Sequence, residues 1–134
     1  MREILFKAKR IIDGEWVEGD IIHSLYKIGD VCVGNFGNGN GIYQVDEKTI
    51  CQYTGLTDKN GNKIWENDVC DRNEKYPEVV KQHKGDWVLD YSYAFGKEDG
   101  YSYCNLGFYT CERNNCVEDI GNIFDDPELL KGGE

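Results

Sequence analysis

Residues 52–69 read Gln-Tyr-Thr-Gly-Leu-Thr-Asp-Lys-Asn-Gly-Asn-Lys-Ile-Trp-Glu-Asn-Asp-Val, and almost every position in this stretch has a definite role in the backbone. Within it, residues 58–61 (Asp-Lys-Asn-Gly) fit a type I turn, in which the Asp58 side chain caps the turn and Gly61 takes the left-handed conformation. A type I′ turn centred on Asn60 and Gly61 is the competing prediction. Either turn closes a β-hairpin.

The same pattern extends in both directions along the chain. Apolar side chains recur with a period of two almost everywhere, and glycine and asparagine punctuate them, which is typical of short strands joined by turns. Downstream of the hairpin, the polar residues 66–68 predict a second sharp bend, because Asn67 tolerates the left-handed region better than most residues. The sequence therefore predicts a mainly β protein.

The first hairpin of this β protein can be placed in register from its turn. If Asp13 and Gly14 form a two-residue turn, Lys9 lies opposite Glu18 and Lys7 lies opposite Asp20. On the other face, the same register pairs Phe6 with Ile21 and Arg10 with Val17. Each opposite-charge pair contributes about 0.2–1 kcal/mol, so the two pairs favour this register without dominating the stability.

Composition limits both the size of the core and the class of partner. The 134 residues suit one domain or two small ones, and 40% hydrophobic content is enough to form an interior. The formal charge of −10 and the pI near 4.6 repel nucleic-acid phosphates at long range, so direct nucleic-acid binding is not expected. No apolar run is long enough to span a bilayer, and the charged opening residues do not resemble a signal peptide. We expect a cytoplasmic protein that does not bind membranes.

The cysteines and histidines do not form a recognisable reactive or metal-binding pattern. The six cysteines have irregular spacings without a Cys-x-x-Cys pair, which favours free thiols in a reducing compartment. Three of them, Cys104, Cys111 and Cys116, are wider apart than zinc ribbons use, so a structural zinc is the minor alternative. The two histidines, His23 and His83, have no recognisable catalytic partner. We expect no metal, no cofactor and no catalytic residue.

The region from residue 72 to residue 109 separates into a polar segment and an aromatic one. Residues 72–84 are polar and contain Pro77, which predicts a linker or an irregular edge with a brief strand at residues 78–80. After it, aromatic side chains alternate along residues 87–95, and residues 96–100 predict a turn. Two readings of the aromatic face remain open: rings that fill a small barrel, or a recognition surface. The candidate protein-binding residues on this face are Tyr91, Tyr93, Tyr101 and Tyr103.

The C-terminal tail contains a helix start signal. Asp126 suits the N-cap, Pro127 the first helical position and Glu128 the positive end of the helix dipole. Only a turn or two can follow before Gly132. We expect one short C-terminal helix that Leu129 and Leu130 pin to the sheet.

Several of these segments together resemble the YopX family of phage and prophage proteins. The resemblance covers residues 2–8, 14–20, 52–69 and 120–130, with Asn67 at a position where the family usually has glycine. It implies a phage or prophage origin and N-terminal β-hairpins, residues 1–51, packed beside a small SH3-like β-barrel, residues 52–134. Because the family has no established activity, the resemblance implies no site residue.

Three functions from different classes remain open on these observations. The first is a non-enzymatic protein-binding module that binds an unknown host or phage protein through an exposed strand edge or the tyrosine-rich face. The second is an acidic decoy that imitates nucleic acid to occupy a host protein. The third is an uncharacterised enzyme, which no residue pattern in the sequence supports. Open strand edges are also compatible with a homo-oligomer.

Overall fold

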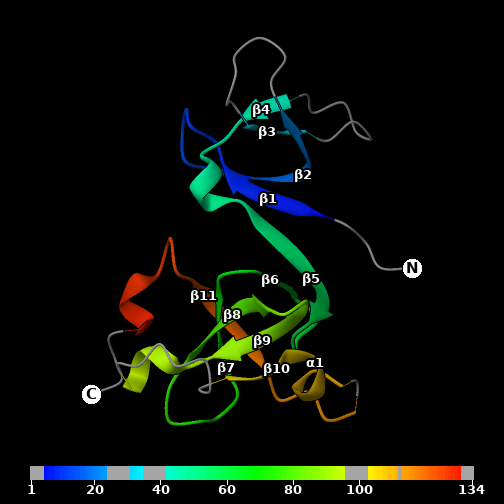
Figure 1. Ribbon diagram of the computed structural model, residues 1–134, viewed down its shortest axis with the longest axis vertical. Coiled ribbons are helices and arrows are strands. Elements are labelled where there is room, and N and C mark those ends of the chain that lie inside the picture. Colours follow the sequence, from blue (N-terminus) through cyan, green and yellow to red (C-terminus); the bar gives the residue numbers. More distant parts are fainter. Residues whose placement is uncertain (1–4, 24–30, 35–41, 96–102, 112, 131–134) are drawn as a thin grey trace. The chain divides into compact units, whose positions relative to one another are not determined.

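The computed structural model describes residues 5–23, 31–34, 42–95, 103–111 and 113–130 and divides the chain into two units, Met1–Tyr53 and Thr54–Glu134 (Figure 1). The fold is mainly β, as predicted, and contains two antiparallel sheets. Across the described ranges neither sheet closes on itself, since each has two different end strands. An SH3-like barrel therefore stays a prediction. Tyr101, the turn at residues 96–100, and the side chains of His23 and Cys32 lie outside what is described.

The first unit consists of antiparallel hairpins. The six-stranded sheet has the order β4-β3-β2-β1-β5-β6, so β1 lies between β2 and β5. A 3₁₀ helix, η1, precedes β5, and the Asp46 side chain caps it by accepting from the Lys48 N–H. The elements in this part of the chain are β1 (Phe6–Lys9), β2 (Trp16–His23), β3 (Val31–Gly34), β4 (Ile42–Gln44), η1 (Glu47–Thr49), β5 (Cys51–Thr57) and β6 (Lys63–Trp65). The boundary between the units falls within β5, so β6 belongs to the second unit.

The register predicted for the β1–β2 hairpin is wrong by two residues. The structure pairs Lys7 with Glu18 and Lys9 with Trp16, so the turn contains residues 11–14 instead of two residues. The predicted pairs Lys9–Glu18 and Lys7–Asp20 do not form, and Phe6 faces Gly19 instead of Ile21.

Local backbone bonds close the longer turn: the N–H of Gly14 donates to the carbonyl of Arg10, and the N–H of Arg10 donates to the carbonyl of Glu15. The other edge of β1 pairs with a more distant segment. The N–H of Ile11 donates to the carbonyl of Gln44, and the N–H of Asp46 donates to the carbonyl of Lys9. These two bonds fasten the end of β1 to residues 44–46, on the edge of β1 that faces away from β2. Gly14 still has a positive φ of 73°, as a tight turn requires.

The second unit is built around a five-stranded antiparallel sheet with the order β10-β9-β8-β7-β11. Its strand β8 (Glu78–His83) lies in the middle of the sheet. The predicted strand at residues 78–80 is therefore present but longer, and the prediction of a linker or sheet edge is wrong for residues 78–83. Pro77 precedes the strand, where its missing N–H costs no ladder bond. The elements are β7 (Asp68–Asp71), β8 (Glu78–His83), β9 (Asp86–Asp90), η2 (Ser92–Phe95), β10 (Tyr103–Asn105), α1 (Leu106–Tyr109), β11 (Glu118–Asn122) and η3 (Pro127–Leu130).

The turn at residues 58–61 forms as predicted. The Gly61 N–H donates to the Asp58 carbonyl at 3.0 Å, and Gly61 has a φ of 84°. The Asp58 carboxylate accepts from the N–H groups of Asn60 and Asn62, each at 2.9 Å. A type I′ turn would also require a positive φ at Asn60, which does not have one. The predicted bend at Asn67 is confirmed as well, with a φ of 70°.

Asp58 has a second role that the sequence does not reveal. Its Oδ2 accepts from the backbone N–H of Asp119 in β11 at 2.9 Å, across 61 residues of sequence. Next to it, the N–H of Lys59 donates to the Val117 carbonyl, and the Asn115 side chain donates to the Thr57 carbonyl. The turn is therefore docked onto the segment that leads into β11, and residue Asp58 is 3% exposed.

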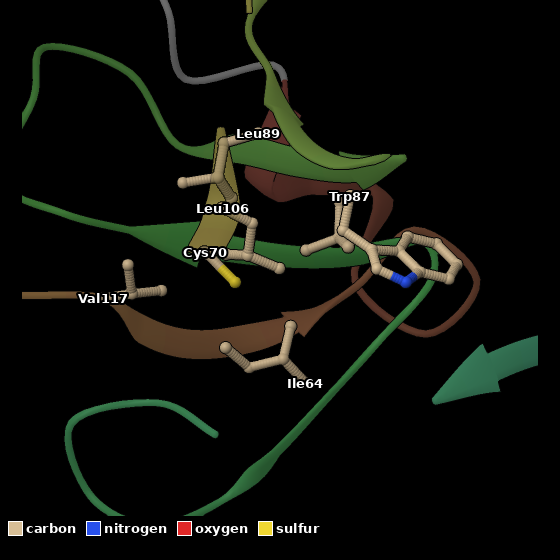
Figure 2. Close-up of a cluster of buried hydrophobic side chains, with 7 residues drawn as sticks. Ile64, Cys70, Trp87, Leu89, Leu106 and Val117 are labelled. Atoms are coloured by element: carbon tan, nitrogen blue, oxygen red, sulfur yellow. The ribbon is translucent and has the colours of Figure 1, made fainter. Parts of the chain in front are cut away.

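The core of the second unit is a single apolar cluster (Figure 2). Its buried members come from β6, β7, β8, β9, α1 and the residue before β11, and they are Ile64, Cys70, Val80, Trp87, Leu89, Leu106 and Val117. Full burial of such side chains contributes roughly 1.5–3 kcal/mol each against an extended-chain reference. In the first unit, the described cluster comprises only Ala8 and Val45, with Val17 and Ile50 packed against them.

The aromatic segment and the tail each differ from prediction in one respect. β9 ends at Asp90 and does not continue to residue 95, because the Asp90 carboxylate accepts from the N–H and hydroxyl of Ser92 and turns the chain. The tail forms the expected short helix, but it is a 3₁₀ helix, η3, and the Asp126 carboxylate accepts from the N–H of Asn122. Asn105 caps a further short helix, α1, that the sequence does not predict.

Candidate functional site

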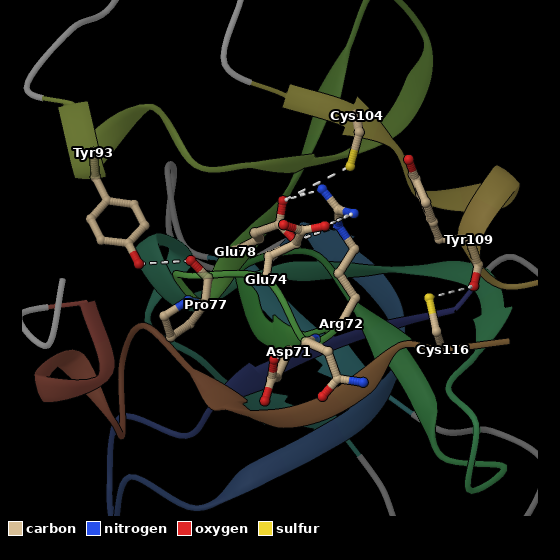
Figure 3. Close-up of polar contacts among 10 residues, drawn as sticks. Asp71, Arg72, Glu74, Pro77, Glu78, Tyr93, Cys104, Tyr109 and Cys116 are labelled. Atoms are coloured by element: carbon tan, nitrogen blue, oxygen red, sulfur yellow. Dashed lines mark hydrogen bonds and ion pairs between the residues drawn. The ribbon is translucent and has the colours of Figure 1, made fainter.

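An open cleft of about 250 Å³ lies in the second unit. Three parts of the chain line it: the connection between β7 and β8, the residue after β9, and the end of α1. Its lining combines charged and aromatic side chains, namely Arg72, Glu74, Lys75, Tyr76, Glu78, Tyr91 and Tyr109. Figure 3 shows four of them, Arg72, Glu74, Glu78 and Tyr109.

The β7–β8 connection presents the charged side chains to this cleft. Asp71 begins it with a turn in which the carboxylate accepts from the N–H of Asn73, and Asn73 has a φ of 68°. Since Cys70 and Glu78 are paired across the two strands, the chain leaves and re-enters the sheet at neighbouring points. Arg72 and Glu78 therefore meet, although six residues separate them.

Arg72 forms a two-pronged ion pair with Glu78. Its Nε is 2.7 Å from Glu78 Oε1, and its Nη2 is 3.3 Å from Oε2. The Glu78 side chain is 1% exposed, whereas Glu74, which accepts from Arg72 Nη1 at 3.0 Å, is 54% exposed. A buried charge pair of this kind is costly to break from one side, because the remaining charge is left without a partner.

The ionisation of the pair follows from its surroundings. Burial by itself lowers the pKa of Arg72, but the hydrogen bonds and charge of Glu78 outweigh it and leave this pKa above its ordinary value. Burial raises the pKa of Glu78, and the bonds from Arg72 oppose that shift. Burial also raises the pKa of the Cys104 thiol to about 11, and this thiol lies 3.9 Å from Glu78 Oε2. Cys104 is therefore protonated at neutral pH and is a poor nucleophile.

One aromatic ring covers the guanidinium group, and others line the same cleft. The ring centroid of Tyr109 is 4.4 Å from Arg72 Cζ, a cation–π distance. Tyr91 faces the same cleft, and burial raises its hydroxyl pKa. Phe108, next to Tyr109, is 63% exposed, and the two rings meet edge-on at 5.0 Å. The site thus has a rigid, charged centre and an aromatic rim.

The three candidate tyrosines that the structure describes do not share one face. Tyr91 lies in the cleft, but the Tyr93 hydroxyl donates to the Pro77 carbonyl at 2.7 Å, and its ring lines a separate pocket of about 170 Å³. Tyr103 lies on β10 against His83, with ring centroids 4.7 Å apart. The end of β9 at Asp90 explains the difference, because Tyr91 and Tyr93 follow the strand and do not alternate on it.

Sequence reasoning missed Arg72, Tyr76 and Tyr109 as neighbours of Tyr91. One signal pointed to them: opposite charges at residues 72 and 78 flank a polar segment that ends in Pro77, as in a loop between paired strands. A second signal was the residue type at Asn105, because asparagine is favoured at helix N-caps and could have indicated the helix that carries Tyr109.

The other reactive side chains in the described ranges do not form a centre. Cys51, Cys70, Cys104, Cys111 and Cys116 are free thiols, as predicted. No three described histidine, cysteine, aspartate or glutamate side chains are grouped as a metal site would require. Among the described helices, none has the length and apolar content needed to cross a bilayer.

Comparison with known proteins places the chain in a family and supports its fold. The family model described as YopX protein matches residues 6–131. A crystal structure of protein EF1440 from Enterococcus faecalis is similar, with a TM-score of 0.57 and 20% sequence identity over 97% of this chain and 99% of that one. No curated protein matches. Since the family model covers most of its length, the chain belongs to the YopX family.

Proposed function

We propose that this YopX-family chain is a phage- or prophage-encoded, non-enzymatic module that binds a host or phage protein in the cytoplasm of the host cell. The observation that carries the proposal is the cleft at Arg72, where an anchored guanidinium lies among Tyr76, Tyr91 and Tyr109. Arginine and tyrosine are the residue types that dominate the energetics of protein interfaces. The exposed ring of Phe108 extends this aromatic surface.

The chemistry of the cleft also favours binding over catalysis. The pKa values of Cys104, Tyr91 and Arg72 are shifted upward, away from neutral pH, whereas a nucleophile or base needs the opposite shift. Glu78, whose pKa moves toward neutral pH, is engaged by Arg72 on both oxygens. A small SH3-like barrel in the second unit, the architecture that the family resemblance implies, would suit peptide recognition.

The test is a native pull-down from host lysate with the tagged full chain and two matched variants. Lys75→Glu reverses an exposed charge at the cleft, and Lys84→Glu reverses one at the far end of β8, about 20 Å along the strand. We expect one stoichiometric partner with the wild type and with Lys84→Glu, and its loss with Lys75→Glu. Capture of the same partner by the wild type and both variants contradicts the proposal. Recovery of the tagged chain alone also contradicts it and indicates self-assembly.

The distribution of charge favours a second candidate, the acidic decoy. Residues 54–134 contain 17 aspartates and glutamates against 9 lysines and arginines, a net charge of −8, whereas residues 1–53 carry −2. A decoy needs carboxylates at the spacing of phosphates, about 7 Å, along one face. Partner capture that 0.5 M salt abolishes and that Lys75→Glu leaves intact would favour the decoy over the cleft.

A further inference from the structure

We propose that Arg72 binds a carboxylate of an acidic segment in the partner protein, at the position that Glu74 now occupies. The inference rests on the proposed function and names the chemical group that the cleft recognises. Glu74 then acts as a built-in competitor for the same guanidinium edge.

The guanidinium is fixed before any ligand arrives. Glu78 holds Nε and Nη2, and the Tyr109 ring covers one face at 4.4 Å. Nη1 is the edge on which Arg72 meets the exposed Glu74 (Figure 3). A pre-positioned arginine loses little side-chain entropy when it binds a carboxylate, and its planar geometry suits that group.

Glu74 can be displaced at small cost. Its side chain is 54% exposed and lies in the bend between β7 and β8, two residues from Arg72. Exposed ion pairs are weak, so the competition lowers the affinity for an incoming carboxylate by roughly 1.5- to 5-fold. Such a contact keeps the arginine occupied without blocking the cleft.

The charge balance of the cleft favours a carboxylate over a phosphate dianion. When Glu74 swings away, Arg72 and Lys75 remain against Glu78, which leaves one net positive charge among the lining side chains. One positive charge matches the single negative charge of an aspartate or glutamate. The aromatic rim at Tyr76, Tyr91 and Tyr109 offers contact area to the residues beside that carboxylate.

The experiment selects random hexapeptides on the immobilised full chain and then compares synthetic versions of one selected peptide by fluorescence anisotropy. The versions carry the acidic residue, its amide counterpart or phosphoserine at the same position. We expect the change from acid to amide to weaken binding by about 10-fold or more, since a charge-assisted hydrogen bond is lost.

Two variants of the protein identify Glu74 as the competitor. Glu74→Ala should tighten the acidic peptide by about 1.5- to 5-fold and leave the amide peptide unchanged. Asp86→Ala is the matched control, because it removes an exposed carboxylate at the start of β9, opposite the far end of β8, and changes the net charge equally. It should alter neither affinity.

The outcomes separate this inference from the function on which it rests. Selected peptides that depend on Lys75 but bind equally as acid and amide overturn the carboxylate site and leave the binding module standing. Tighter binding of the phosphoserine peptide, or equal effects of Glu74→Ala and Asp86→Ala, also overturns it. Failure to select any peptide that binds the wild type more tightly than Lys75→Glu counts against both proposals.

Discussion

The described residues of the two units differ in the size of their buried apolar clusters. The second unit has a cluster of seven buried apolar side chains from several elements, whereas the described cluster of the first unit contains two small residues, Ala8 and Val45. In the first unit, backbone bonds also tie Lys9 and Ile11 to residues 44–46. Side-chain packing should therefore dominate the stability of the second unit, and local backbone geometry should matter in both.

The largest expected difference between the units comes from cavities. Leu89→Ala in the second unit should lower the free energy of unfolding by about 2–5 kcal/mol, because it leaves a hole in a fully buried cluster. Val45→Ala in the first unit removes two methyl groups from a thin cluster and should cost about 1–2 kcal/mol. Urea unfolding followed by circular dichroism measures both. Equal or reversed costs would break the contrast.

Turn aspartates give the next largest difference. Asp58→Ala removes a buried acceptor from Asn60, Asn62 and Asp119 and should destabilise by about 2–3 kcal/mol, since buried donors lose their partners. In the first unit, the exposed Asp13 accepts from Glu15 and pairs loosely with Arg10, so Asp13→Ala should cost less than about 1 kcal/mol. Thermal unfolding ranks the two variants, and similar losses would show that docking onto β11 contributes little.

Replacement of a turn glycine should destabilise both units by similar amounts. Gly61 and Gly14 have φ values of 84° and 73°, and no atom lies within 4 Å of where a Cβ would stand at either position. Because strain and not crowding sets the cost, Gly61→Val and Gly14→Val should each destabilise by roughly 1–2 kcal/mol. Melting of the Gly61→Val protein within error of the wild type would refute the positive-φ turn at residues 58–61.

The smallest expected effect is confined to acid pH. Burial raises the pKa of Asp58, but the hydrogen bonds from Asp119, Asn62 and Asn60 outweigh burial and hold this pKa below its ordinary value of 3.8. Its stabilising contribution is therefore complete above pH 3.8 and is lost as the pH falls through the folded-state pKa. The stability of Asp58→Asn should fall less steeply than that of the wild type below pH 4, as urea unfolding at several pH values would show. A parallel fall in both proteins would contradict this linkage.

Glu78 provides a contrast of sign within the second unit. Its pKa is raised by burial, so its stabilising contribution is present below the ordinary value and is lost as the pH rises through the folded-state pKa. The free energy of unfolding therefore changes with pH in opposite directions for the two carboxylates. Below pH 4, the loss of stability involves Asp58 and not Glu78.

The parts of the fold that could be predicted from the sequence depend on local backbone preferences. The turn at Asp58 and Gly61, the bend at Asn67 and the short helix that starts at Pro127 all lie where such preferences placed them. The cleft was only partly accessible to sequence reasoning. Tyr91 was named as a candidate, but its neighbour Arg72 was not, because their proximity depends on how β7, β8 and β9 pair.

The sequence by itself therefore determined a mainly β chain and the turns at Gly61 and Asn67, because a residue's φ preference and the alternation of side chains act over a few positions. Its motifs also indicated the family. Only the tertiary structure showed the register of the first hairpin, in which Arg10 and not Ile12 pairs with Glu15. It also decided the docking of Asp58 on Asp119 and the meeting of Arg72 with Glu78 and Tyr109. These contacts join groups distant in sequence, so their free energies depend on the assembled sheet and have no local signature.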